Sequence, residues 1–293
     1  MSIKIGDIVT RPSYGRDLLF RVISINTNEK GEHYATLYGE DVRLIADAPF
    51  FDLEVVSRIE REQRLKKEDE LLEQSLSLIQ QDYHLVRQKS EYTATNGYSH
   101  SHRFFQMPGK VLHLDGDPNY LRKCLMLYEK IGIPVYGVHC LEKEMPHRIG
   151  KLIDEVRPDL LVITGHDAYS RSKGKKTDLM AYRHSGHFVQ TVQEARKKVP
   201  HRDQLVIFAG ACQSHFESLI AAGANFASSP ARVNIHALDP VYIVSRISFT
   251  PFTDDINVWD VLKNTLTGDK GLGGIQTRGL LRTGMPYHPQ DDE

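Results

Sequence analysis

The second half of this 293-residue chain alternates short apolar segments with segments of helical periodicity. The apolar segments fall at residues 111–114, 135–140, 160–164, 205–209 and 224–228, and the helices between and after them are expected at about 119–130, 145–156, 179–198 and 213–222. Strands that are apolar on both faces are typical of a parallel sheet that is covered by helices on both sides. With right-handed crossovers between the strands, this pattern predicts an α/β domain, a three-layer sandwich around a mainly parallel sheet.

Two other patterns precede this domain. Residues 1–56 hold short alternating segments, the last at 42–45, separated by glycine-bearing turns, which predicts a small SH3-like β-barrel. Residues 57–89 are rich in charges of both signs and carry a narrow apolar seam, so we expect a long linker helix. The polar residues 91–102 are expected to form a loop. We therefore predict a barrel domain at 1–56, a linker helix and loop at 57–104, and the α/β domain at 105–293.

Charge, apolar content and cysteine spacing narrow both the classes of partner and the expected cellular location. The 37 basic and 38 acidic side chains leave a net charge of −1, which gives no global field for nucleic acid. No segment approaches the roughly 18 apolar residues of a membrane span, and the first residues do not resemble a secretory signal. The three cysteines lack paired spacing, which argues against a disulfide framework. We therefore expect a soluble intracellular protein.

Potentially reactive side chains follow the apolar segments. In an open parallel sheet, ligands bind beyond the carboxyl ends of the strands. His166 follows the third segment and Cys212 the fourth, so the two side chains are expected at one edge of the sheet. A thiol nucleophile and an imidazole that activates it are the groups that a cysteine protease needs. Cys212 is also expected at the N-terminus of a helix, whose dipole favours the thiolate.

Other cysteines and histidines have weaker claims. Cys124 lies within an expected helix and is predicted to be part of the core. Cys140 directly follows a strand and is the less favoured nucleophile. His215 is the rival base, although its helix is expected to direct it away from the strand ends, and His113 is expected to be buried and hydrogen-bonded within a strand.

Several sequence blocks resemble a known family. They are LHLDGD at 112–117, TGHDAYS at 164–170, FAGACQSHF at 208–216 and ASSP at 227–230, with KIGDIV at 4–9 and VRLIAD at 42–47. Together they resemble the YabG family of sporulation-specific proteases over nearly the whole chain. A strand ending in Gly-His and a second ending in Ala-Cys also resemble the caspase-like clan of cysteine peptidases. The chain departs from that clan at Asp167, where a glycine is usual.

The resemblance implies both a fold and an activity. It implies a caspase-like α/β domain and an endopeptidase that processes spore coat and related proteins, cutting next to arginine. It also implies a location in the cytoplasm of the sporulating cell, in association with the forming spore coat. Neither a metal nor an organic cofactor is implied, the partners are protein substrates rather than nucleic acid or membrane, and self-cleavage is left open.

Arginine specificity adds a demand for acidic residues. A buried guanidinium needs a carboxylate, and in caspase-like folds the loop after the first strand lines the specificity pocket. Asp115 and Asp117 are therefore the candidates, although Asp117 could instead cap the next helix. Ser228 and Ser229 are expected to flank the same pocket. The backbone N–H groups of Gly165 and Cys212 are the candidates for the oxyanion hole.

Two rival functions use other features. A flavodoxin- or receiver-like binding module would use Asp115 and Asp117 to hold Mg²⁺ or accept phosphate, but it assigns no role to His166 and Cys212. A cysteine-dependent amidotransferase favours glycine two residues after the nucleophile, where this chain has Ser214. We therefore predict a cysteine endopeptidase with a His166–Cys212 dyad.

Overall fold

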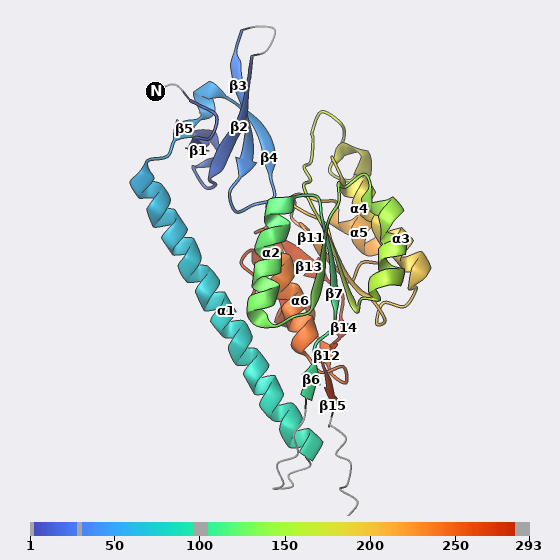
Figure 1. Cartoon of the computed structure of the whole chain (residues 1–293). Coiled ribbons are helices and arrows are strands. Elements are labelled where there is room, and N and C mark those ends of the chain that lie inside the picture. The colour runs from blue at the N-terminus through green and yellow to red at the C-terminus, as the bar shows by residue number, and fades with distance from the viewer. Residues whose placement is uncertain (1–2, 28–30, 96–104, 285–293) are drawn as a thin grey trace, which may run out of the picture.

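The computed structural model describes residues 3–27, 31–95 and 105–284. In it, a long helix joins an N-terminal antiparallel sheet to a mixed sheet that carries helices on both faces (Figure 1). No helix in the described part of the chain combines the length and apolar character that crossing a membrane requires.

The N-terminal sheet has five antiparallel strands in the order β4-β3-β2-β1-β5. They are β1 (Ile8–Thr10), β2 (Phe20–Thr27), β3 (His33–Gly39), β4 (Ile45–Pro49) and β5 (Glu54–Val55), with short 3-10 helices at Pro12–Tyr14 and Phe50–Asp52. Within the described residues the edge strands β4 and β5 do not pair, so the predicted barrel is not confirmed. The strand expected at 42–45 also differs, because β4 begins at Ile45 and residues 40–44 turn toward the second sheet.

The predicted linker helix is confirmed as α1 (Arg58–Thr95). Its 38 residues make it about 57 Å long at 1.5 Å per residue. Leu76 and Ile79 are buried on the seam that faces the second sheet's helices. The helix runs into the segment that was expected to be a loop from residue 91, and the remainder of that predicted loop, 96–104, lies outside the described residues.

The second sheet confirms the predicted parallel strands. Its order is β13-β11-β10-β9-β7-β8, and all neighbouring strands are parallel except β13, which is antiparallel to β11. The strands are β7 (Val111–Asp115), β8 (Val135–His139), β9 (Leu160–Thr164), β10 (Val206–Ala209), β11 (Phe226–Ser228) and β13 (Leu272–Gly274). Every residue of β7, β9, β10 and β11 is buried, as expected for a sheet with both faces covered.

Helices lie on both faces of this sheet (Figure 1). One face carries α2 (Pro118–Ile131) and α6 (Asp239–Phe249), and the other carries α3 (Met145–Val156), α4 (Ser185–Lys198) and α5 (Phe216–Ala222). The apolar core on the α2 and α6 face continues into the N-terminal sheet, whereas the core on the α3 face contains no residue of that sheet. The caspase-like assignment of this fold stays a prediction.

Two helices begin later than the sequence pattern predicts. The helix expected at 179–198 starts at Ser185, after a 3-10 turn at Leu179–Ala181, and the helix expected at 213–222 starts at Phe216. Polar side chains in these segments bind backbone groups and so form loops. The remaining elements are β6 (Phe105–Met107) paired with β15 (Arg282–Gly284), β12 (Asp255–Ile256) paired with β14 (Thr277–Arg278), α7 (Val258–Leu262) and a 3-10 turn at Gly268–Lys270.

Candidate active site

The predicted site residues lie at the carboxyl ends of neighbouring strands. The connection after β7 leads to β8 on one side, and the connection after β9 leads to β10 on the other side. The strand order therefore reverses between β7 and β9, which is where open α/β sheets bind ligands. His166 follows β9 and Cys212 follows β10. Because Ile163 pairs with Ala209, and each site residue is three positions further on, His166 and Cys212 leave the sheet at the same level.

Asp117 orients the imidazole of His166. The His166 Nε2 lies 2.9 Å from Oδ2 of Asp117, which also accepts a hydrogen bond of 2.9 Å from the Tyr38 hydroxyl. The other carboxylate oxygen caps α2 by accepting the backbone N–H groups of Asn119 and Tyr120. Burial would raise the pKa of Asp117, but the hydrogen bonds from His166 and from the backbone lower it overall. Asp117 is thus the helix cap that the sequence suggested and also a partner of His166.

One nitrogen of His166 is left for chemistry. The ring is almost wholly buried, and its Nδ1 has no hydrogen-bond partner among the described residues. A carboxylate can only accept a hydrogen bond, so Nε2 carries a proton and donates to Asp117. In the neutral imidazole, Nδ1 is then the basic nitrogen. This pairing of imidazole and carboxylate is the arrangement that sets the tautomer in catalytic triads.

Cys212 is held as a buried thiol. Its Sγ accepts the N–H of Ile235 at 3.4 Å and donates to the carbonyl of the same residue at 3.6 Å. Burial raises the pKa of the thiol to about 12, and neither the backbone hydrogen bond from Ile235 nor the positive charge of Arg43 compensates. The expected helix-dipole activation is wrong for this structure, because α5 starts at Phe216 and its N-cap is His215.

Asp115 already binds a guanidinium, from Arg43. Both side chains are fully buried, and Nη1 of Arg43 contacts Oδ2 of Asp115 directly. Burial would raise the pKa of Asp115, but Arg43 and His113 hold it well below its usual range. His113 is buried as predicted, with Nε2 3.0 Å from the hydroxyl of Thr164.

The two predicted pocket serines, Ser228 and Ser229, form hydrogen bonds with the backbone of the loops around Cys212. The hydroxyl of Ser228 donates to the carbonyl of Ala211 at 2.7 Å, and the hydroxyl of Ser229 donates to the carbonyl of Val233 at 2.7 Å. Both residues are fully buried. Their predicted place in a specificity pocket stays a prediction, since these hydrogen bonds join them to backbone rather than to Asp115.

Glu142 is a site residue that the sequence analysis missed. Its carboxylate accepts the backbone N–H of His166 at 2.8 Å and is 6 % exposed. It fills space left by two glycines, because a Cβ on Gly165 would lie 2.5 Å from Oε1, and a Cβ on Gly116 would also clash with it. Glycine at both strand ends was the available signal that another group packs closely against them.

Asp167 links the end of β9 to two other loops of the site. The carboxylate accepts hydrogen bonds from Ser214 at 2.9 Å, from the N–H of His184 at 2.8 Å and from the hydroxyl of Ser185. Ser214 in turn accepts the N–H of Ala211 at 2.9 Å. Asp167 therefore ties the end of β9 to the loop that carries Cys212. Burial raises its pKa, although these hydrogen bonds oppose the increase.

The remaining candidates make contacts that involve neither His166 nor Cys212. His215 caps α5 by accepting the N–H of Ser218, and its ring packs edge-on against Tyr182. Cys124 is fully buried, as predicted, and Cys140 is also buried. Among the described residues, no group of three or more His, Cys, Asp or Glu side chains is arranged to hold a metal ion. Asp115 is occupied by Arg43, which leaves the predicted Mg²⁺-binding alternative without a free pair of acids.

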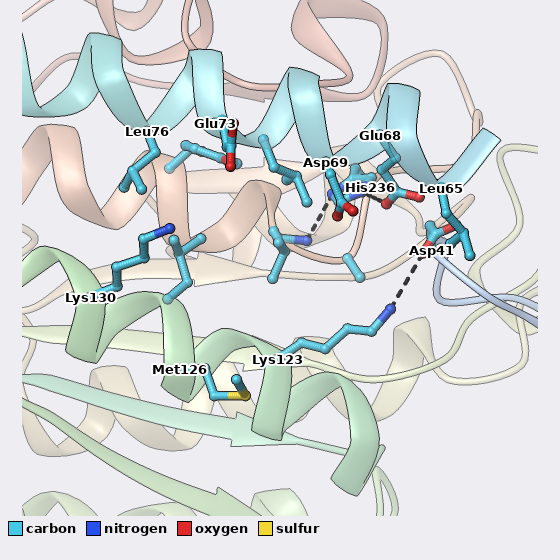
Figure 2. Close-up of a pocket in the computed structure, with 15 residues that line it drawn as sticks. Asp41, Leu65, Glu68, Asp69, Glu73, Leu76, Lys123, Met126, Lys130 and His236 are labelled. Atoms are coloured by element: carbon cyan, nitrogen blue, oxygen red, sulfur yellow. Dashed lines mark hydrogen bonds and ion pairs between the residues drawn. The ribbon is translucent and has the colours of Figure 1, made fainter. Parts of the chain in front are cut away.

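The N-terminal sheet covers this site. Tyr38 of β3 stacks on Tyr120 with ring centroids 5.3 Å apart and meets the ring of His166 edge-on at 6.0 Å. Beside it, a cavity of about 490 Å³ lies between α1 and α2 (Figure 2). In that cavity wall Lys123 pairs with Asp41 at 3.3 Å, and His236 contacts Glu68 at 3.0 Å.

Comparison with known proteins identifies relatives along almost the whole chain. The profile of the family described as YabG peptidase U57 matches residues 4–286. The chain is 65 % identical over 287 residues to the sporulation-specific protease YabG of Bacillus subtilis (strain 168), covering 98 % of this chain and 99 % of that protein. No solved structure matches the chain.

Proposed function

Because the chain belongs to the YabG peptidase U57 family, and is therefore a peptidase, we propose that it is a sporulation-specific cysteine endopeptidase that cuts proteins next to arginine. The observation that supports the catalytic proposal is the His166 ring, which Asp117 orients and which follows β9, the strand next to the one that leads to Cys212. The proposed substrates are spore coat and related proteins, met in the cytoplasm of the sporulating cell and at the forming coat. Self-cleavage is part of this proposal.

The proposed reaction proceeds through a thioester. Nδ1 of His166 takes the proton of the Cys212 thiol, and the thiolate attacks the carbonyl carbon of the peptide bond. The backbone N–H groups of Gly165 and Cys212 stabilise the oxyanion, and His166 returns the proton to the leaving amine. Water then hydrolyses the thioester and restores the thiol. Asp117 acts as a positioning residue that keeps the basic nitrogen of His166 toward the thiol.

The structure fits a resting form of such an enzyme. In it, the hydrogen bonds of the Cys212 thiol go to Ile235, and the pKa of about 12 leaves almost no thiolate at neutral pH. We propose that catalysis requires Cys212 to leave this buried position and meet His166. Its neighbour Gln213 has a φ of 57°, a conformation that costs energy in a non-glycine residue and favours rearrangement of this loop.

Asp115 is the proposed acid for substrate arginine. A buried, ionised carboxylate can accept two parallel hydrogen bonds from a guanidinium. A lysine ammonium matches this geometry less well, so such a carboxylate favours arginine. The existing ion pair with Arg43 supports this proposal, because it places a guanidinium on that carboxylate. Asp117 is the weaker candidate, since both of its oxygens are engaged by His166, Tyr38 and the start of α2. Ser228 and Ser229 are proposed to support the pocket wall.

The proposal is tested with a short fluorogenic peptide that ends in arginine. Wild type is expected to release the fluorophore, Cys212→Ala and His166→Ala to fall to background, and the control Cys140→Ala to match wild type. A matched peptide ending in glutamate should not be cut. Full activity in Cys212→Ala would show that the nucleophile is another group.

A further inference from the structure

The segment between β3 and β4 pairs with the backbone just before α6, in the manner of a bound peptide. Val42 forms an antiparallel bridge with His236, and the N–H of Ala237 donates to the carbonyl of Asp41 at 2.9 Å. The hydroxyl of Tyr120 lies within hydrogen-bond distance of the carbonyls of Gly39 and Val42, 2.7 Å from the latter, and can donate its proton to either. Main-chain pairing of an extended segment is a common way for proteins to bind peptides.

The side chain of Arg43 fills a pocket built for a guanidinium. Asp115 neutralises its charge, and the carbonyl of Ala237 accepts from Nη2 at 3.1 Å. The guanidinium carbon also lies 5.1 Å from the ring centroid of Tyr120, within the range of a cation–π interaction. Both charges are fully buried, so each depends on the other for compensation.

The same segment lies against the nucleophile. Cys212 is hydrogen-bonded to both backbone groups of Ile235, which immediately precedes the residue paired with Val42. The backbone of Arg43 and its positive charge both lower the pKa of the Cys212 thiol, against the larger increase caused by burial. A second cavity, of about 860 Å³, extends from Val42 past Gln213 and Val233, so space continues from this segment along the loop that carries Cys212.

Side chains from α1 and α2 form polar contacts with the segment and with the residue it pairs with. Lys123 of α2 donates to the carbonyl of Glu40 at 2.9 Å and pairs with the carboxylate of Asp41. Glu68 of α1 contacts His236, on the strand-like partner of Val42 (Figure 2). The segment is therefore held both through its own backbone and side chains and through His236, the residue that pairs with Val42.

On the premise of the proposed peptidase activity, we propose that residues 41–43 are an intramolecular pseudosubstrate. Arg43 occupies the pocket that recognises substrate arginine, with Asp115, the Ala237 carbonyl and Tyr120 as its walls. The N-terminal sheet thus keeps the peptidase closed until this segment withdraws, and an arginine-containing protein substrate competes with it for the same pocket.

The pocket is tested by binding, independently of catalysis. In the full chain carrying Cys212→Ala, we compare the parent, Arg43→Gln, Arg11→Gln and the double variant Arg43→Gln/Asp115→Asn. The probe is agmatine, measured by calorimetry, with putrescine as a cation that lacks the guanidinium. Saturable agmatine binding is expected only in Arg43→Gln. Arg11→Gln is the matched control, because Arg11 pairs with the buried carboxylate of Asp52 in the N-terminal region, outside both the pocket and the segment.

Folding is followed in the same samples. Arg43→Gln leaves Asp115 buried without its partner, so its melting temperature should fall and then recover when agmatine is added. The double variant removes both charges and should melt cooperatively without responding to agmatine. If Arg43→Gln neither binds agmatine nor recovers with it, the pocket is not an arginine site and the Arg43–Asp115 pair only joins the two sheets.

Activity then separates this inference from the proposed function. With Cys212 restored, Arg43→Gln should cut the arginine peptide at least about tenfold faster than wild type, and Arg11→Gln should match wild type. Agmatine binding without cleavage in any variant would retain the pocket and reject the cysteine-peptidase mechanism. Equal rates in wild type and Arg43→Gln, with a cooperative melt in both, would overturn the autoinhibition.

Discussion

Asp117 serves two structures at once. One oxygen caps α2 and the other binds His166, so the residue that starts a helix also fixes the tautomer of the proposed base. The sequence suggested an N-cap or a pocket acid at this position. The contact with His166 could not be read from it, because the two residues are 49 positions apart and meet only when β7 and β9 pair.

Replacing Asp117 with asparagine separates these two roles. Asparagine is as good an N-cap as aspartate, so the melting temperature of Asp117→Asn should change little. Loss of the carboxylate removes the acceptor that fixes the His166 tautomer, and kcat should fall by about 10²-fold or more, with a smaller effect on KM. Steady-state kinetics and a thermal melt of the same samples test this, since a loss of kcat without a loss of stability separates the positioning role from the cap. Unchanged kcat would show that Asp117 is only a cap.

At the scale of elements, the segment between β3 and β4 is the least ordinary part of the chain. The alternating pattern predicted a strand at 42–45, yet Arg43 points into the second sheet and β4 begins only at Ile45. Local pattern cannot detect this, because an apolar–charged alternation is the same for a sheet strand as for a segment that buries its charge on a distant acid. Helices α2 and α3, by contrast, follow the predicted ranges because their periodicity and caps are local.

The carboxyl group of Asp41 makes the stability of the folded chain around this segment dependent on pH. Burial, and then the neighbouring Glu68, raise the pKa of Asp41 to about 6, while Lys123 and His236 oppose the increase. The folded state therefore binds this proton more tightly than the unfolded chain, whose ordinary value is 3.8. The resulting stabilisation is present below pH 4 and is lost as the pH rises through about 6.

Unfolding measurements on Asp41→Asn test this directly. Wild type should lose stability relative to the variant between pH 4 and pH 7, by about 1–2 kcal/mol, because Asp41 is partly solvent-exposed and screening reduces the full effect of the shift. Urea unfolding at pH 4 and at pH 7 gives the comparison. The same pH dependence in both proteins would mean that Asp41 does not carry the effect.

At the scale of the molecule, the two sheets share one core. Val42, Leu37 and Phe20 of the N-terminal region belong to the same apolar cluster as Cys212, whereas Cys140 belongs to the cluster on the opposite face of the second sheet. Because Cys212 belongs to the core shared by both sheets, we expect its exposure to reagents to depend on how the two sheets pack. Opening between them would expose Cys212 and leave Cys140 covered.

Alkylation of the intact protein measures this packing. In native buffer at pH 8, Cys212 should react with iodoacetamide at least about 10²-fold more slowly than free cysteine, because a thiol with a pKa of about 12 is almost fully protonated. In urea below the unfolding transition, peptide mapping should find Cys212 modified before Cys140. Reaction of native Cys212 at the rate of a free thiol would show that the site is open without separation of the sheets.

The sequence by itself determined the parallel sheet, the long helix and the strand ends at which His166, Cys212, Asp115 and Asp117 lie, since periodicity and strand polarity are local properties. Only the tertiary structure decided what those side chains contact. Arg43 meets Asp115 across 72 residues, Tyr38 meets Asp117 across 79, and Cys212 is buried by a segment 23 residues further on. Such contacts depend on how two sheets and a connecting helix pack, because burying a charge or a thiol requires partners that no local pattern specifies.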